Sequence, residues 1–276
     1  MAAPDALFTM DFTADELRES GKDSYAVLRG PFDQWLAERA EEAGADFIYG
    51  IAVEDLIVRD GRVCGVVAGG DEVEARITVL ADGANSLLAQ KAGLADDVPL
   101  PCQMAVGAKE TIALPPSVIE DRFLCAPGEG AAWMFAGDCT KGRVGGGFLY
   151  TNDDSISLGL VATLSDLAAG DVPIYQMLED FKQRADIAPL VKGGELVEYS
   201  GHLVPEGGLA MVPRLYGDGV LVCGDAAMLC MNLGYSVRGM DFAVSSGDLA
   251  ADAVMRALSI REHDACGRFV HRARLW

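Results

Sequence analysis

The sequence is poor in positive charge, and this argues against one large class of partners. Lysine and arginine number 22 against 42 aspartates and glutamates, which gives a formal net charge of −20. Binding to a nucleic-acid backbone needs clustered cations, so the composition predicts no nucleic-acid partner. Acidity of this size serves solubility in many proteins, and a basic protein partner is the more specific alternative.

Paired cysteine motifs are missing as well. The cysteines are odd in number and never spaced as C-x-x-C: Cys64, Cys102, Cys125, Cys139, Cys223, Cys230 and Cys266. This pattern predicts no disulfide framework, no zinc site and no iron–sulfur site, and it fits a reducing cytoplasm. Cys64 and Cys223 lie in apolar strand-like runs and are predicted to be core residues.

Several catalytic signatures are absent too. The three histidines, His202, His263 and His271, match neither metal nor triad spacing. No G-x-S-x-G turn and no Walker loop occurs. No apolar run approaches the ~18–20 residues of a membrane span, and the first residues lack the basic start of a signal peptide. The predicted location is the cytoplasm, with peripheral contact at the inner face of the membrane left open.

The elements that are present indicate a mixed fold. Residues 25–28 are predicted as a strand, and a helix follows from Pro31 to Gly44. Asp60-Gly61 predicts a hairpin, and residues 77–81 predict a further strand. From about Cys102 onward the sequence predicts antiparallel strands rich in glycine and aromatic residues, with a turn at residues 151–154.

Two helices complete this pattern. One carries Ile174, Met177, Leu178 and Phe181 on a single face, and the other spans residues 248–259. The fold class is α/β (α+β). We predict a nucleotide-type lobe over residues 1–101, an antiparallel-sheet lobe with one helix over 102–212, and a return to the first lobe over 213–276.

Two apolar strands end in aspartate beside glycine, in "VLADGANS" (79–86) and "LVCGDAA" (221–227). Ligands of α/β folds bind beyond the carboxyl ends of strands, where an aspartate can accept hydrogen bonds from sugar hydroxyls. A single Asp-Gly is most often a turn, but two that each close an apolar strand favour a site. Arg29 taken alone favours a solvated residue, and Arg238 in its glycine-bounded loop is a candidate anion ligand.

Together, "SYAVLRGPFDQWLAERAEEAGA", "VLADGANSLLAQKAGL" and "GVLVCGDAAMLCMNLGYSVRGMDFA" resemble the FixC-type flavoproteins. These are relatives of the electron-transfer-flavoprotein:quinone oxidoreductases and, more distantly, of geranylgeranyl reductases and aromatic hydroxylases. The resemblance implies an FAD-dependent oxidoreductase with electron-transfer flavoprotein subunits, a small ferredoxin and a quinone as partners. No catalytic side chain is named, because the flavin carries the chemistry. No metal is expected.

The resemblance also implies the residues that bind the cofactor. Asp225, with Gly224, matches the position that contacts the ribityl chain, and Asp82 and Gly83 match the position near the pyrophosphate. The other implied positions are Arg29 near the phosphates, Val53 on the strand that meets the adenine, and Asn232, Gly234 and Arg238 in the loop beside the isoalloxazine ring.

One departure qualifies this interpretation. The family opens with a strand leading into G-x-G-x-x-G, and this sequence has no such motif. The chain therefore resembles a fragment, and we expect no bound FAD on the 276-residue chain itself. Two other readings stay open: a reductase or hydroxylase acting on a lipid or aromatic substrate, and an inactive domain or interaction module.

Overall fold

A computed structural model describes residues 3, 8–10, 16, 19–20, 24–95, 98–206, 208–234 and 236–263 of the chain. The chain divides into two compact units. Unit 1 holds the residues up to Phe47 together with Ala105–His202, and unit 2 holds Ile48–Met104 together with the residues from Leu203 onward.

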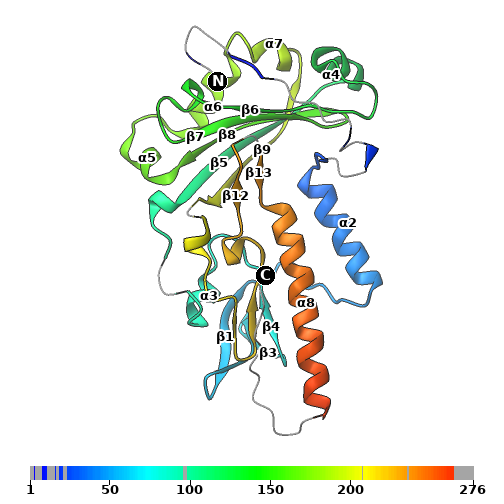
Figure 1. The fold of residues 1–276 in the computed structure, drawn as a ribbon, viewed down its shortest axis with the longest axis vertical. Helices are drawn as coiled ribbons and strands as arrows, with labels where there is room; N and C mark the ends of the chain where they lie inside the picture. The colour runs from blue at the N-terminus through cyan, green and yellow to red at the C-terminus, as the bar shows by residue number, and fades with distance from the viewer. Residues whose placement is uncertain are drawn as a thin grey trace. The chain divides into compact units, whose positions relative to one another are not determined.

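Unit 1 is built on a five-stranded sheet with the strand order β6-β7-β8-β5-β9. Three of its neighbouring pairs, β6–β7, β7–β8 and β5–β8, are antiparallel. Helices α4, α6 and α7 lie on one face of this sheet (Figure 1). The strands are β5 (Met104–Ala113), β6 (Ala132–Phe135), β7 (Gly145–Thr151), β8 (Ser155–Thr163) and β9 (Glu195–Pro205). The helices are α2 (Arg29–Glu42), α4 (Pro116–Phe123), α5 (Leu164–Ala169), α6 (Ile174–Lys182) and α7 (Ala188–Val191), with the 3-10 turn η2 (Asp138–Thr140).

The core of unit 1 lies between the sheet and these helices. Ile156, Leu158 and Leu160 alternate along β8 and are fully buried in one cluster with Phe181 of α6. A side chain at Gly147 would meet the Phe181 ring at 2.9 Å, so this glycine lets the helix approach the sheet. The strands predicted from Cys102 onward, the turn between β7 and β8 and the apolar face of α6 are confirmed. Burial of each of these large side chains contributes about 1.5–3 kcal/mol.

One ion pair is buried beneath the end of α6. Glu110 of β5 is 2% exposed, and its two carboxylate oxygens accept hydrogen bonds from the Lys182 ammonium at 3.0 and 2.8 Å. Glu179 accepts a third at 2.8 Å. Burial lowers the pKa of Lys182, but its hydrogen bonds to Glu110 and Glu179 outweigh this effect, so the pKa is raised. The pair ties α6 to β5.

We expect Lys182→Met to lower the free energy of unfolding by about 3 kcal/mol, because the Glu110 carboxylate stays buried without its cation. Lys141→Met is the matched control, since Lys141 pairs with Asp180 at 2.6 Å on the surface and exposed pairs contribute at most about 1 kcal/mol. Urea unfolding of both variants measures the difference. Equal losses for the two variants would contradict the prediction.

The first sheet of unit 2 is antiparallel, with the order β1-β2-β3. Asp60 and Gly61 connect β1 to β2 with φ angles of 51° and 79°. These angles are those of the turn that matches the twist of a two-residue hairpin. The hairpin predicted at Asp60-Gly61 is therefore confirmed. The strands are β1 (Val53–Arg59), β2 (Arg62–Ala68) and β3 (Asp71–Glu74).

The second sheet of unit 2 is mixed and has the order β10-β11-β4. Strands β10 (Tyr216–Gly217) and β11 (Val220–Val222) pair antiparallel, whereas β11 and β4 (Thr78–Leu80) pair parallel. The buried residues of β4 and β11 cluster with those of α3 (Leu87–Lys91). This cluster forms the core of unit 2: Leu56, Val63, Leu80, Leu88, Ala89, Leu94, Val220, Val222, Ala226 and Ala227.

The two sheets of unit 2 are joined at one corner. The Arg62 guanidinium pairs with the Asp218 carboxylate and donates to the Arg76 carbonyl at 2.6 Å. The Val63 N–H donates to the Asp218 carbonyl at 2.9 Å. These bonds anchor the β1–β2 hairpin on the second sheet.

Unit 2 contains further elements outside these two sheets. They are η1 (Pro101–Gln103), η3 (Gly208–Met211), η4 (Gly224–Ala227), β12 (Met231–Asn232), β13 (Val237–Arg238) and α8 (Met240–His263). Helix α8 contains the predicted helical segment 248–259. Among the described residues, no helix combines the length and the apolar character needed to cross a membrane.

Two sequence predictions need correction at the N-terminal side. The helix expected at Pro31 begins two residues earlier, at Arg29, and ends at Glu42, just before Gly44 with its φ of 95°. The strand predicted over residues 25–28 is wrong: residues 24–28 have no regular secondary structure. A strand-like run of residues forms a strand only where a partner strand is available.

The compact units also divide the chain at different points from the predicted lobes. Residues up to Phe47 group with the five-stranded sheet rather than with the segments that contain β1–β4. The predicted boundaries 1–101, 102–212 and 213–276 place them in the nucleotide-type lobe. The assignment of one lobe to the cofactor and the other to the substrate stays a prediction.

Candidate functional site

The ends of β4 and β11 lie side by side in unit 2. Their parallel pairing puts Leu80 opposite Val222, and the Cys223 N–H donates to the Leu80 carbonyl at 3.0 Å just beyond the strands. Asp82 follows β4 and Asp225 follows β11. Parallel α/β sheets bind ligands at this edge. The structure thus places both carboxylates on neighbouring loops of the edge where a ligand is expected.

The loop after β4 is fixed by one serine. The Ser86 hydroxyl donates to the Asp82 carboxylate at 2.7 Å and accepts from the Ala89 N–H at 3.3 Å, as the N-cap of α3. Ser86 is buried, whereas Asp82 is exposed. Gly83 has a φ of 81°, and a side chain there would meet no atom within 4 Å. The loop therefore presents Asp82 beside open space.

The turn after β11 is tighter. Gly224 is buried and has a φ of 65°, a conformation that favours glycine. Its N–H donates to the Ser246 hydroxyl of α8 at 2.9 Å. The Asp225 carbonyl accepts from the Met228 N–H at 2.9 Å, which closes η4. Gly224 thus shapes the turn, and its N–H is already used within the protein.

Two thiols flank Asp225 in the chain. Burial raises the pKa of Cys223. Burial also raises the pKa of Cys230, and the charges of Asp225 and Glu206 add to the effect. Both thiols are therefore held in the protonated form, which is a poor nucleophile. In the part of the chain that the structure describes, no group of three His, Cys, Asp or Glu side chains is placed to hold a metal ion.

The loop predicted to pass the flavin ring is a short hairpin, β12–β13. The Asn232 side-chain oxygen accepts from the Gly234 N–H at 2.8 Å, which shapes its tip. Arg238 donates to Asp241 at 2.6 Å and stacks 5.0 Å above the centroid of the Phe242 ring. Its cation is thus held at the start of α8. Tyr235 lies outside the described residues.

Two further predicted positions lie elsewhere. Val53 begins β1 and pairs with Ala68 in the antiparallel sheet of unit 2. Arg29 opens α2 in unit 1, and its guanidinium makes two hydrogen bonds of 2.8 Å with the Asp33 carboxylate. The structure therefore brings Asp82 and Asp225 to one sheet edge and gives Arg29 a carboxylate partner of its own.

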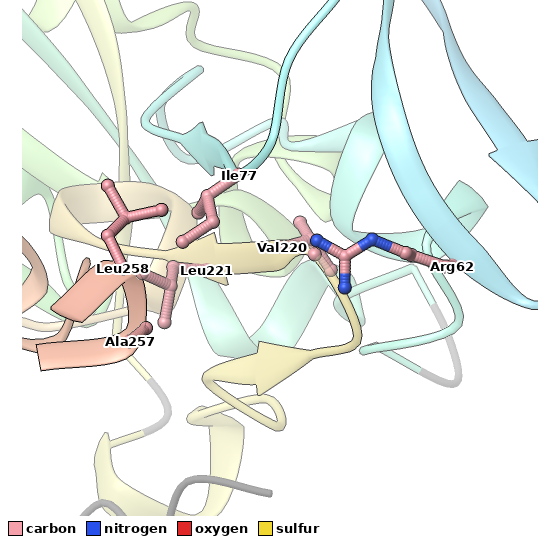
Figure 2. A pocket seen from close by; sticks show the side chains of 7 residues that line it. Arg62, Ile77, Val220, Leu221, Ala257 and Leu258 are labelled. Atoms are coloured by element: carbon pink, nitrogen blue, oxygen red, sulfur yellow. The ribbon is translucent and has the colours of Figure 1, made fainter. Parts of the chain in front are cut away.

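A small cavity lies at the opposite end of β4 and β11. Ile77, Val220 and Leu221 line it together with Ala257 and Leu258 of α8 (Figure 2). Its volume of about 10 Å³ admits about one water molecule. This cavity is not a cofactor site.

A larger groove of about 600 Å³ lies in unit 1 between β5, β9, α6 and α7. Glu110 and Lys182 line it, and these two side chains are already paired with each other. None of the predicted site residues lines this groove.

The sequence analysis did not single out Ser86 and Ser246. Ser86 carries a local signal, because a serine directly before an apolar helical run is a typical N-cap. Ser246 carries none, since its partner Gly224 is 22 positions away in the chain. Only the folded structure reveals its contact.

Solved structures with this fold include flavin enzymes. A geranylgeranyl bacteriochlorophyll reductase-like protein from Thermoplasma acidophilum matches with a TM-score of 0.68 and 20% identity, over 86% of this chain and 56% of that one. The myxobacterial FAD-dependent halogenase CndH matches with a TM-score of 0.66 and 21% identity, over 86% and 53%. The predicted fold class is therefore confirmed: the chain has the mixed helix-and-sheet fold of these proteins.

Curated sequences carry the comparison further, although no family model matches. Protein FixC of Escherichia coli K12 is 54% identical over 250 residues, which cover 91% of this chain and 58% of FixC. The probable electron transfer flavoprotein-quinone oxidoreductase YdiS of the same organism is 52% identical over 251 residues, 90% of this chain and 58% of YdiS. The chain thus spans less than two thirds of the length of these relatives. The resemblance to the FixC-type flavoproteins is confirmed.

We expect Ser86→Ala to lower the free energy of unfolding by about 1 kcal/mol, because α3 loses its N-cap. Ser165→Ala is the matched control: the Ser165 hydroxyl bonds the adjacent Asp166 carboxylate at 3.4 Å but caps no helix. Urea unfolding followed by circular dichroism measures both variants. The prediction fails if the Ser165 variant loses as much stability as the Ser86 variant.

Proposed function

We propose that this sequence is part of an FAD-dependent oxidoreductase that takes electrons from an electron-transfer flavoprotein and passes them to a quinone. The likeness to FixC and YdiS supports the reaction class. One structural observation carries the assignment of the site: the parallel register that sets Asp82 and Asp225 on neighbouring loops. The flavin would supply the redox chemistry, and the protein would bind and orient it.

The residues after the two strands fit the polar part of this cofactor. Asp225 would accept hydrogen bonds from the ribityl hydroxyls, as a carboxylate at the carboxyl end of a parallel strand can. Asp82 would face the region between ribityl chain and pyrophosphate, where Gly83 leaves open space. Gly224 would contribute the turn that presents Asp225 rather than a hydrogen bond of its own, since its N–H is used by Ser246.

The remaining implied positions would contact other parts of the cofactor. Val53 would lie on the strand beside the adenine, and Asn232, Gly234 and Arg238 would lie beside the isoalloxazine ring. Arg29 would approach the phosphates, although Asp33 already occupies its guanidinium. A phosphate would have to compete with that carboxylate or share the cation with it.

The partners follow from the relatives and the cysteine pattern. The name of YdiS supports an electron-transfer flavoprotein and a quinone. We extend the proposal to a small ferredoxin subunit, because this sequence has no C-x-x-C with which to hold an iron–sulfur centre itself. A cytoplasmic location with peripheral contact at the membrane would give access to the quinone.

A second candidate acts on a lipid or aromatic substrate. The rings of Phe148 and Tyr150 stack on β7 with centroids 5.8 Å apart and an angle of 16°, and such a pair suits a flat apolar molecule. Reduction of a short-chain ubiquinone by the complete protein, with reduced electron-transfer flavoprotein as donor, separates the two candidates. No quinone reduction would favour the second candidate, and no flavin binding at all would favour an interaction module.

FAD binding itself is tested by a chimera. We expect the 276-residue chain to bind no stoichiometric FAD, because it has no G-x-G-x-x-G turn to hold the pyrophosphate. A FixC in which this chain replaces the matching 250 residues should bind one FAD. Visible absorbance of the purified proteins measures both. A stoichiometric flavin spectrum on the 276-residue chain would overturn the prediction.

Within that chimera, we expect Asp225→Asn to raise the Kd for FAD about 10- to 100-fold. A hydrogen bond to a charged group contributes about 1.5–3 kcal/mol, and the amide removes that charge while keeping the shape. Asp248→Asn, at an exposed position of α8, is the control and should leave the Kd unchanged. Fluorescence titration with FAD measures all three proteins. An unchanged Kd for the Asp225 variant would remove Asp225 from the site.

A further inference from the structure

One side chain of α8 reaches back to the turn after β11. The Ser246 hydroxyl accepts the Gly224 N–H at 2.9 Å and donates its own hydrogen to the Ala243 carbonyl at 2.9 Å. Ser246 is half-buried, and Gly224 is buried. The hydroxyl therefore donates one hydrogen bond inside the helix and accepts one from the turn that follows β11.

This bond has a specific geometric effect. Gly224 is directly followed by Asp225. Ala243 lies in the first turn of α8, and its N–H donates to the Gly239 carbonyl at 2.8 Å. Ser246 therefore joins the start of η4 to the start of α8. The chain between them contains the β12–β13 hairpin, so Ser246 links the two ends of the segment that carries this hairpin.

A serine within a helix ordinarily bonds only the carbonyl three or four residues earlier. Ser259 does this farther along α8, where its hydroxyl donates to the Arg256 carbonyl at 2.9 Å. Ser246 makes the same bond and adds the amide of Gly224. Because a buried N–H without a partner is costly, removal of this hydroxyl should loosen the turn that presents Asp225.

We propose that Ser246 is a positioning residue of the flavin site. It fixes the Asp225 carboxylate, on the ribityl side, relative to the β12–β13 hairpin and the first turn of α8, on the ring side. This inference rests on the proposed function, since the ribityl and ring sides are those of the proposed FAD. The residue touches neither the cofactor nor a substrate in this assignment and acts through Gly224.

The first test needs no cofactor. In the 276-residue chain, we expect Ser246→Ala to speed hydrogen exchange of the Gly224 amide at least tenfold, measured by NMR. Ser246→Thr keeps the hydroxyl and should restore protection. Ser259→Ala, which removes the matched intrahelical bond alone, should leave Gly224 unchanged. If Ser246→Ala proves unfolded by circular dichroism, Ser246→Cys, with its weaker acceptor, replaces it.

The second test uses the FixC chimera and FAD. We expect Ser246→Ala to raise the Kd for FAD about tenfold and to shift the flavin absorbance maxima and midpoint potential, with Ser246→Thr near the parent. Unchanged exchange at Gly224 would overturn the proposal, as would faster exchange with an unchanged Kd, spectrum and potential. Loss of FAD binding by the unsubstituted chimera would instead refute the proposed function, while the exchange result would still report on the bond itself.

Discussion

The parallel pairing of β4 with β11 is the constraint on which unit 2 depends. Only three residue pairs form it, from Thr78 opposite Val220 to Leu80 opposite Val222, yet it joins chain segments that the whole five-stranded sheet separates. Leu80, Val220 and Val222 bury their side chains in the core of unit 2, which compensates for the loss of chain entropy. Without this register, Asp82 and Asp225 would not leave the same edge of the sheet.

The loops beyond that edge follow a common plan. At each strand end a serine hydroxyl links the loop to a helix: Ser86 bonds Asp82 and caps α3, and Ser246 of α8 accepts from Gly224. The backbone and hydroxyl groups satisfy one another within the loops, as groups removed from water must. The Asp82 carboxylate takes part in this arrangement, since it accepts a hydrogen bond from the Ser86 hydroxyl within its own loop at 2.7 Å.

Some of this could be predicted from the sequence because its signals are local. Asp60-Gly61 defines its own hairpin, and the spacing of Met177, Leu178 and Phe181 defines the buried face of α6 wherever the helix packs. The strand predicted over residues 25–28 failed because a strand needs a partner that its own residues do not specify.

The long-range features could not be predicted in this way. The pairing of Glu110 with Lys182 and the contact of Ser246 with Gly224 join residues far apart in the chain. In the same way, the Asp-Gly pairs marked both strand ends, but the parallel register that sets them side by side appears only in the fold. The contact of Ser86 with Asp82 differs from these, because it is local: the two residues are four positions apart, and the N-cap signal of Ser86 can be read from the sequence.

The chain enters and leaves the five-stranded sheet of unit 1, which is inserted between β4 and β11, at neighbouring positions. The Glu206 N–H donates to the Gln103 carbonyl at 2.7 Å, and β5 and β9, the first and last strands of the insertion, are neighbours in the sheet. Once that sheet has formed, the roughly 140 residues between β4 and β11 behave as a shorter connection, because loop-closure entropy depends on the length of free chain. During synthesis the ribosome releases the sheet before β11. We therefore expect β11 to pair with β4 only after the five-stranded sheet has formed.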